Sequence, residues 1–103
     1  MFFDEADAIK ESFDNVIYVD REKLAFPLEL RIWRAGDVFY PFGMKGKKKL
    51  SKYLKDEKLS VVEKENTWVL TSNNEIVWVV GKRGDNRFRV TEATNNILKI
   101  ELS

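Results

Sequence analysis

One segment constrains the fold of this chain more than any other, because it has the pattern of two strands joined by a tight turn. Residues 67–71 and 75–80 are rich in β-branched and aromatic side chains. Asn73 and Asn74 lie between them, and asparagine tolerates positive φ, so the segment is predicted to be a β-hairpin. The second strand is apolar on both faces. It is therefore expected to lie centrally in a sheet that is covered on both sides, with Trp78 in the core.

Two signals predict further strands: short runs of β-branched residues and period-two alternation. Alternation of this kind places one side of a strand against a core. These strands are expected at residues 16–19, 28–32, 87–90 and 97–102. In the third of them, Phe88 and Val90 are expected to point inward, and Arg87 and Arg89 outward. Trp33 follows the second, and packing in the core is preferred to an exposed stacking platform, because large aromatic side chains are mostly buried.

Local signals also predict three short helices. Residues 47–55 carry an apolar stripe opposite a row of lysines, which is the pattern of a helix with one buried face. The stripe consists of Leu50, Tyr53 and Leu54. Ser60 followed by Glu63 matches a capping box, so a second helix is expected from Ser60 to near Asn66. Apolar residues at helical spacing predict a third helix within residues 2–15.

A chain of 103 residues is long enough to bury one core without disulfides or metal ions. The predicted strands outnumber the helices. The fold class is therefore predicted to be α+β: a small single domain with a mainly antiparallel or mixed β-sheet and two or three short helices packed on it. Residues 1–15 are expected to form a lead-in segment, and residues 16–103 the domain itself.

The composition excludes several kinds of site. The chain has no cysteine and no histidine, which removes thiol nucleophiles, Cys/His metal sites and histidine general bases. No apolar run is long enough to span a membrane, and no segment resembles a signal peptide. We therefore predict a soluble, cytoplasmic chain with no metal site and no membrane partner.

The formal net charge of +1 conceals two basic segments. Residues 45–58 contain seven lysines against two acids, and residues 81–91 contain four basic residues against one acid, whereas residues 1–29 are strongly acidic. An uneven distribution of this kind matters more than the total charge for binding a polyanion. A run of lysines more often serves only as a solvated surface, so the basic segments alone do not decide the function.

The first basic segment follows a loop rich in glycine and aromatic residues, with the sequence GDVFYPFGMKGKKK from residue 36 to residue 49. Five residues are expected to shape this loop through turns and restricted backbone angles. They are Gly36, Asp37, Pro41, Gly43 and Gly46. A catalytic role for Asp37 is less favoured than ordering of the turn, because aspartate commonly bonds the backbone that follows it.

The sequence resembles the C-terminal domain of the bacterial tRNA(Ile)-lysidine synthases. The resemblance rests first on LRIWRAGD at residues 30–37 and on PFGMKGKKKL at residues 41–50. It continues through IVWVVG at residues 76–81 and the arginines that follow, and it covers most of the chain from Val16 onward. The glycine and lysine segment is its most specific part.

The resemblance implies a domain of a longer enzyme that consumes ATP to ligate lysine to the wobble cytidine of a CAU-anticodon isoleucine tRNA. The family's catalytic centre belongs to an N-terminal domain whose phosphate-loop motif does not occur here. This chain is therefore expected to hold no catalytic site and to bind no cofactor, with ATP and lysine as substrates of the full-length enzyme. Its implied partners are the CAU-anticodon tRNA(Ile) and the N-terminal catalytic domain, and no DNA.

In the family this domain grips the acceptor-stem region of the tRNA. The resemblance assigns tRNA contacts to Arg31, Arg34, Lys45, Lys47, Lys48, Lys49, Arg83 and Arg87. The basic side of the predicted helix and the outward side of the predicted strand add Lys52 and Arg89. Lysine supplies mobile charge and arginine offers bidentate phosphate contacts, which suits a duplex RNA read through its backbone.

Two functions other than tRNA binding stay open at this point. One is a protein-interaction module that docks against the catalytic domain or another subunit. The other is a small independent enzyme. An exposed apolar patch including Phe2, Phe3 and Trp33 would favour docking. A deep pocket with convergent carboxylates would favour an enzyme. The enzyme is the third choice, because the sequence lacks histidine, cysteine and a phosphate loop.

Overall fold

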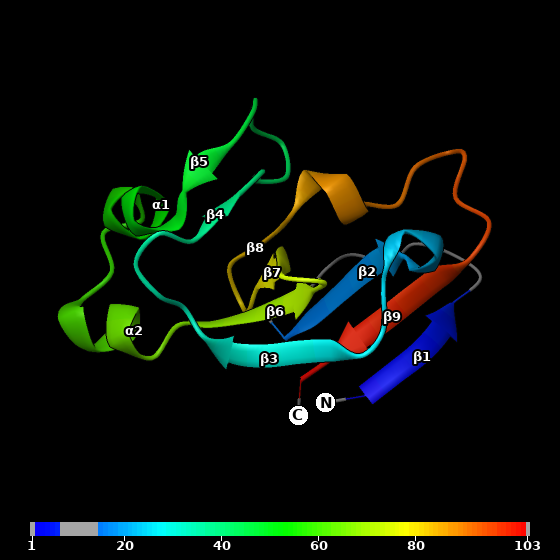
Figure 1. The fold of residues 1–103 in the computed structure, drawn as a ribbon, viewed down its shortest axis with the longest axis horizontal. Coiled ribbons are helices and arrows are strands. Elements are labelled where there is room, and N and C mark those ends of the chain that lie inside the picture. The colour runs from blue at the N-terminus through cyan, green and yellow to red at the C-terminus, as the bar shows by residue number, and fades with distance from the viewer. Residues whose placement is uncertain (1, 7–14, 103) are drawn as a thin grey trace.

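A computed structural model describes the backbone of residues 2–6 and the whole of residues 15–102 (Figure 1). Every pair of strands in this part of the chain is antiparallel. The strands are β1 (Phe2–Ala6), β2 (Val16–Asp20), β3 (Leu28–Ile32), β4 (Val38–Phe39), β5 (Lys48–Lys49), β6 (Trp68–Ser72), β7 (Glu75–Val79), β8 (Arg83–Gly84) and β9 (Ile97–Glu101). The helices are α1 (Leu50–Asp56) and α2 (Val61–Glu65), with the 3-10 turns η1 (Arg21–Lys23) and η2 (Asn86–Phe88).

The strands form three sheets, with the orders β1-β9-β2, β3-β6-β7-β8 and β4-β5. The predicted hairpin is confirmed as β6 and β7, and both Asn73 and Asn74 at its turn have positive φ angles, of 50° and 67°. The pairing shifts register between Leu70 and Thr71, which is a β-bulge. Because a bulge reorients the residues beside it, side chains of β7 reach both faces of the sheet without strict alternation.

The central sheet β3-β6-β7-β8 is covered on both faces, as the apolar pattern of β7 predicts. Leu70 and Trp78 lie in one buried cluster together with residues of β2 and β9, so the sheet β1-β9-β2 covers that face. Val69 and Val79 lie in a second buried cluster with Phe39 of β4 and the apolar stripe of α1. Trp78 is 3% exposed and is a core residue.

The two helices follow the local signals in the sequence. All three residues of the predicted stripe of α1 are buried, namely Leu50, Tyr53 and Leu54. The helix begins at Leu50 rather than Lys47, because Lys48 and Lys49 pair with β4 as a strand instead. At α2 the capping box is complete: Ser60 accepts from the backbone N–H of Glu63, and the Glu63 carboxylate accepts from that of Ser60, both at 3.1 Å.

Two predictions of secondary structure are wrong. Residues 2–6, assigned to a helix, form strand β1 in an edge position beside β9; the remainder of that predicted helix, residues 7–14, lies outside the described residues. Residues 87–90, assigned to a strand, begin within the 3-10 turn η2. The Asp85 side chain accepts from the Arg87 N–H and caps that turn, which starts a helical turn where alternation alone predicts a strand. Phe88 is buried as expected.

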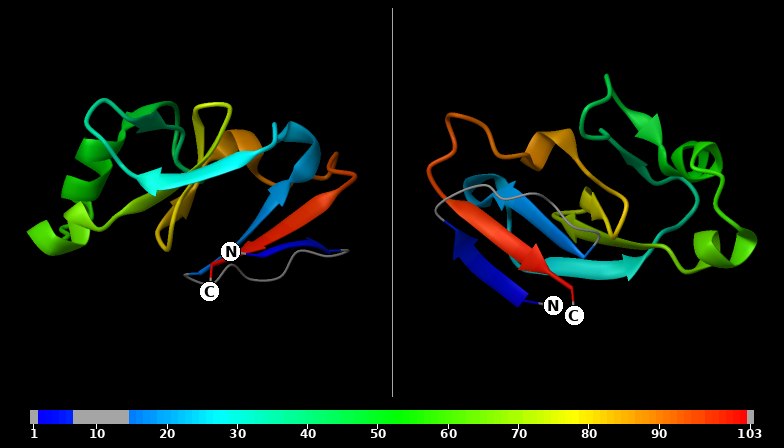
Figure 2. Two further views of the ribbon diagram at one scale, coloured as in Figure 1. Left: turned by 60° about the horizontal axis from the view of Figure 1, so that its bottom comes forward. Right: turned by 180° about the vertical axis from the view of Figure 1, so that it is seen from behind.

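The helices and the sheet β1-β9-β2 lie at opposite ends of the molecule, as two further views show (Figure 2). Trp33 lies beside the helical end. Its side chain packs against the second buried cluster, and its indole Nε1–H donates to the carbonyl of Lys64 in α2 at 2.6 Å. Packing, not an exposed stacking platform, is therefore its role. The confirmed fold is α+β, although its strands form three sheets where one was expected.

Candidate nucleic-acid interface

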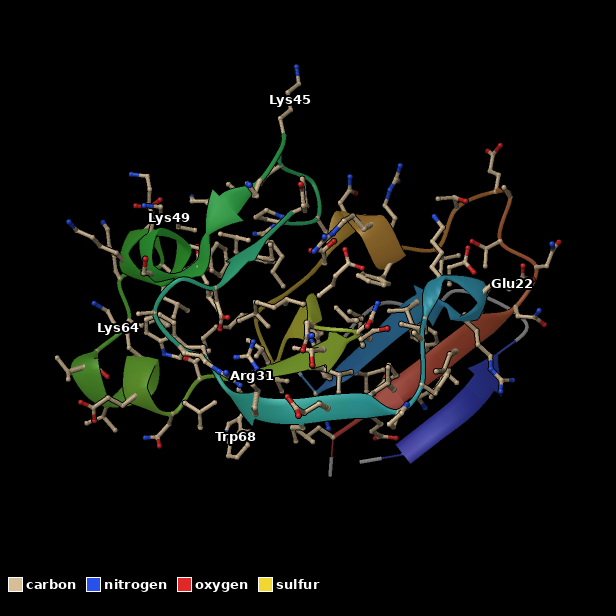
Figure 3. All side chains as sticks on the ribbon, viewed as in Figure 1. Glu22, Arg31, Lys45, Lys49, Lys64 and Trp68 are labelled. Carbon is tan, nitrogen blue, oxygen red and sulfur yellow. The ribbon has the colours of Figure 1, made fainter. Side chains whose placement is uncertain are left out.

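The lysine-rich segment forms a projecting loop between β4 and β5, and we refer to residues 40–49 as the basic loop. Lys45 lies near its tip, and its side chain extends away from the rest of the molecule, while Lys49 lies beside α1 (Figure 3). The base of the loop is fixed where Val38 pairs with Lys49 and Phe39 with Lys48. Phe39 is completely buried against Tyr53. Phe39 therefore anchors the base of the loop, and Lys45, Lys47 and Lys49 are exposed to solvent.

A single buried carboxylate joins the basic loop to the second basic segment. The side chain of Asp85 is fully buried and accepts four hydrogen bonds. The Tyr40 N–H donates to its Oδ2 at 2.9 Å, and the Arg87 N–H to its Oδ1 at 2.7 Å. The guanidinium of Arg87 donates to both oxygens at 3.0 Å. Both acceptor atoms are thus occupied, and the two basic segments are joined at this point.

Residues next to Asp85 strengthen the same junction. The backbone N–H of Phe42 donates to the carbonyl of Gly84 at 2.9 Å. Arg83 donates through Nη1 to the carbonyl of Phe42 at 2.8 Å and through Nε to the hydroxyl of Tyr53 at 3.4 Å. Arg83 therefore ties the basic loop to α1 as well as to β8.

Arg31 and Asp37 form a second charged junction, at the start of the segment. Arg31 donates two bonds to the carboxylate of Asp37, at 2.9 and 3.0 Å, and the backbone N–H of Arg34 adds a third at 2.9 Å. Burial acts to raise the pKa of Asp37, but these bonds and the nearby positive charges outweigh it and hold that pKa below its ordinary value. The carboxylate consequently orders the turn before β4.

Four of the ten predicted tRNA-binding residues have partners within the domain. They are Arg31, Lys48, Arg83 and Arg87. Lys48 donates to Asp56 at 2.8 Å, and Arg87 adds an ion pair with Glu75 at 2.8 Å and lies over the ring of Tyr40, 4.4 Å from its centre. For Arg87, burial acts to lower the pKa, but Asp85 and Glu75 outweigh it and raise that pKa above its ordinary value.

The other six predicted residues form no ion pair and no side-chain hydrogen bond with the described part of the chain, and we call them the unpartnered cations. They are Arg34, Lys45, Lys47, Lys49, Lys52 and Arg89. All six are exposed. Because exposed amines and guanidiniums without an internal partner keep their charge available, these residues have the physical properties that a phosphate contact requires.

Three of the residues expected to shape the loop are glycines with positive φ angles. Gly36, Gly43 and Gly46 have φ of 93°, 81° and 71°, values at which other residues are strained. Pro41 is buried and forms a bridge with Asp85. The structure thus shows how the segment turns at these positions.

Asp85 and Tyr40 are the site residues that sequence reasoning missed. A local signal existed for Asp85, because an aspartate that follows glycine and precedes a short polar stretch is a common N-cap. The partners of Tyr40 lie about half a chain away in sequence, so no local signal could have indicated them. Within the described residues, no cluster of three or more acidic side chains is placed to hold a metal ion, and no helix is long and apolar enough to cross a membrane.

Comparison with known proteins supplies the family. The model of the family described as "TilS substrate C-terminal domain" matches residues 28–102, which is well over half of the chain. The chain belongs to this family. A crystal structure titled "Crystal structure of TILS C-terminal domain" superposes with a TM-score of 0.75 at 24% identity, covering 98% of this chain and 81% of that one. At that identity the superposition supports the fold.

Curated relatives of this TilS C-terminal domain carry the name tRNA(Ile)-lysidine synthase. The protein from Parabacteroides distasonis is 57% identical over 88 residues, which cover 85% of this chain and 20% of that protein. The protein from Bacteroides thetaiotaomicron is 49% identical over 79 residues, covering 77% of this chain and 18% of that protein. The chain therefore spans about one fifth of the length of these relatives. The resemblance seen in the sequence is confirmed.

Proposed function

We propose that this chain is the non-catalytic tRNA-binding domain of a tRNA(Ile)-lysidine synthase, and that it grips the acceptor-stem region of the CAU-anticodon tRNA(Ile). The full-length enzyme would bind the same tRNA through its N-terminal domain and use ATP to ligate lysine to the wobble cytidine. The curated relatives, named for that activity, support the enzyme assignment. The observation that carries the role of this domain is the set of unpartnered cations on and beside a rigidly held loop.

The geometry of the basic loop suits a duplex RNA. The deep major groove of an A-form duplex excludes side chains, so proteins contact such a duplex mainly through phosphates and 2′-hydroxyl groups. Lys45, Lys47 and Lys49 project from a loop whose base is pinned by Asp85 and by the pairing of β4 with β5. Lys52 continues the positive charge onto α1. A rigid base with mobile ammonium groups can follow a phosphate backbone without reading its sequence.

The partnered residues have a different role in this proposal. Arg31, Arg83 and Arg87 hold the turn before β4 and the base of the loop through their intramolecular bonds. A guanidinium bound on one edge retains donors for a phosphate, so these residues can also contact RNA, but their removal would disturb the loop as well. The cleaner test is to remove the unpartnered lysines.

The test compares two variants with equal loss of charge. Lys45→Ala/Lys49→Ala removes two unpartnered cations, whereas Lys23→Ala/Lys99→Ala removes two lysines from η1 and β9, at the other end of the molecule (Figure 1). Binding is measured by fluorescence anisotropy to the CAU-anticodon tRNA(Ile), to its acceptor-stem hairpin and to its anticodon hairpin. We expect the acceptor-stem hairpin to bind like the whole tRNA and only the first variant to weaken it. Preference for the anticodon hairpin, or equal effects of both variants, would contradict the proposal.

Docking against another part of the full-length protein is the alternative function, and a separate observation favours it. Ile32 and Trp68 lie directly opposite each other on β3 and β6 and are 38% and 42% exposed. Val61 and Val62 on the neighbouring α2 are more exposed still. Exposed apolar groups that cluster in this way mark interaction surfaces. The side chains of Phe2 and Phe3, expected in such a patch, lie outside the described residues, and Trp33 packs inward.

The two functions separate in the full-length enzyme. Ile32→Ser/Trp68→Ser should leave tRNA binding by the isolated domain unchanged. If the patch docks, the same change should reduce lysidine formation by the full-length enzyme. Unchanged lysidine formation would leave tRNA binding as the only supported function of the domain.

A further inference from the structure

A pocket of about 420 Å³ lies between β2 and the segment that runs from Gly81 to Val90. Its volume falls in the range of small-molecule sites. Its walls combine buried apolar residues, among them Ile17 and Trp78, with Phe42 from the basic loop and with the cations Lys82 and Arg89. Neither the proposed phosphate contacts of the basic loop nor the exposed apolar patch uses this space.

The pocket exists because two sheets come close together at their edges. Strand β2 is the edge strand of its sheet and β8 is the edge strand of the central sheet. Gly84 of β8 faces Ile17, and a Cβ at Gly84 would lie 2.7 Å from the Cδ1 of Ile17, closer than atoms pack. An isolated bridge also joins Val19 of β2 to Arg89. The two walls of the pocket are therefore held against each other at Gly84 and at Arg89.

The charge inside the pocket is positive. Lys82 and Arg89 form no ion pair and no side-chain hydrogen bond with the described residues. Arg83 also lines the pocket, but it donates to the Phe42 carbonyl and to Tyr53. Among the described residues that line the pocket, the one carboxylate belongs to Asp85, whose oxygens are already occupied by four hydrogen bonds. Two cations are thus left for an anionic group.

Phe42 supplies an exposed aromatic ring on a backbone that is held by hydrogen bonds. The residue is 49% exposed, yet its backbone N–H donates to Gly84 and its carbonyl accepts from Arg83. An aromatic ring held at a pocket rim beside free cations is the arrangement on which an unpaired base stacks while its phosphate meets positive charge. Binding of an aliphatic ligand would not require an aromatic ring. Binding of a phosphate alone would not require the buried apolar residues Ile17 and Trp78, which we call the apolar floor.

We propose that this pocket binds one unpaired nucleotide, with the base against Phe42 and the apolar floor and the phosphate at Lys82 and Arg89. The pocket adjoins the basic loop through Phe42, so a tRNA held on that loop can supply the nucleotide from its single-stranded 3′ end. This source rests on the proposed function. Free ATP offers the same chemistry and is the other source.

The experiment measures binding of the chain to three ligands: intact tRNA(Ile), the same tRNA trimmed of its unpaired 3′ nucleotides, and ATP. The test variant is Phe42→Ala, and the control is Trp68→Ala, which removes a similarly exposed ring from β6, outside the pocket. Stacking of one base predicts about a tenfold loss of affinity when either the ring or the base is removed. We expect trimming to lower the affinity of the wild type for the tRNA about tenfold. Phe42→Ala should not lower the affinity for the trimmed tRNA any further. Lys82→Ala should repeat this pattern.

Equal affinity of the wild type for intact and trimmed tRNA, together with no binding of ATP, would overturn the pocket proposal while leaving the proposed function in place. If neither tRNA binds, the proposed function fails instead. The pocket is then judged on ATP: binding that Phe42→Ala abolishes and Trp68→Ala preserves supports it, and no binding overturns it.

Discussion

Replacement of Asp85 by alanine is expected to be the most damaging single change to the candidate interface. The carboxylate is fully buried, and it is bound by Tyr40 N–H and by three donors of Arg87. Its loss leaves two backbone N–H groups and one guanidinium without their acceptor. Arg87 keeps its exposed ion pair with Glu75 and its position over the ring of Tyr40.

The magnitude follows from what is left unpaired. Removing one partner of a buried ion pair costs about 3–5 kcal/mol, because the remaining charge stays partly desolvated. Arg87 is about one third exposed, so solvent screens part of that cost. Each hydrogen bond to a charged group contributes about 1.5–3 kcal/mol. We expect Asp85→Ala to lower the free energy of unfolding by about 3 kcal/mol. Asp85→Asn should lose less, since the amide oxygen can still accept from one backbone N–H.

The assay is urea unfolding, monitored by tryptophan fluorescence, of the wild type, Asp85→Ala, Arg87→Ala and the double variant. A double-mutant cycle should give a coupling energy of about 1.5–3 kcal/mol between Asp85 and Arg87. The Tyr40 N–H loses its acceptor in Asp85→Ala whether or not Arg87 is present, so this cost cancels in the cycle and is not part of the coupling energy. A loss below about 1 kcal/mol in Asp85→Ala, or purely additive effects, would refute the view that this carboxylate joins the two basic segments.

Three further predictions concern local features. Ser60→Ala removes one half of the capping box and should lower the free energy of unfolding by about 1 kcal/mol in urea unfolding, with little change for Ser51→Ala, an exposed serine within α1. Gly43→Ala places a Cβ on a residue with φ of 81° and should cost about 1–2 kcal/mol; a neutral result would refute the need for glycine there. The pKa of Asp37 is held below its ordinary value of 3.8, so its stabilising contribution is complete at neutral pH and is lost as the pH falls below that value. Asp37→Asn should therefore be less stable than the wild type at pH 7, with the difference shrinking towards pH 2, and a difference independent of pH would contradict this.

Features with local signals could be predicted from the sequence. The hairpin at Asn73 and Asn74, the apolar stripe of α1 and the capping box at Ser60 each depend on residues within a few positions of one another. The structure bears them out because local geometry and burial agree at these positions. The family resemblance was likewise carried by contiguous motifs.

Features that depend on distant partners could not be predicted. Strand β1 lies beside β9, nearly a whole chain length away, and its acidic helical spacing gave no indication of that pairing. The alternation at residues 87–90 is genuine, but the Asp85 cap directs the backbone into a 3-10 turn. The division of the ten candidate residues into partnered and unpartnered cations required knowledge of which hydrogen-bond acceptors lie nearby. The roles of all ten in tRNA binding, and the boundary placed at residue 15, stay predictions.

The most direct test of the account is the salt dependence of tRNA binding. Affinity of the chain for the CAU-anticodon tRNA(Ile) is measured between low and physiological salt for the wild type, Lys45→Ala/Lys49→Ala and Lys23→Ala/Lys99→Ala. Each lost phosphate contact lowers the slope of log affinity against log salt by about one. We predict a slope smaller by about two for the first variant only. Identical slopes for all three proteins, or no binding by the wild type at low salt, would contradict the assignment of these lysines to tRNA.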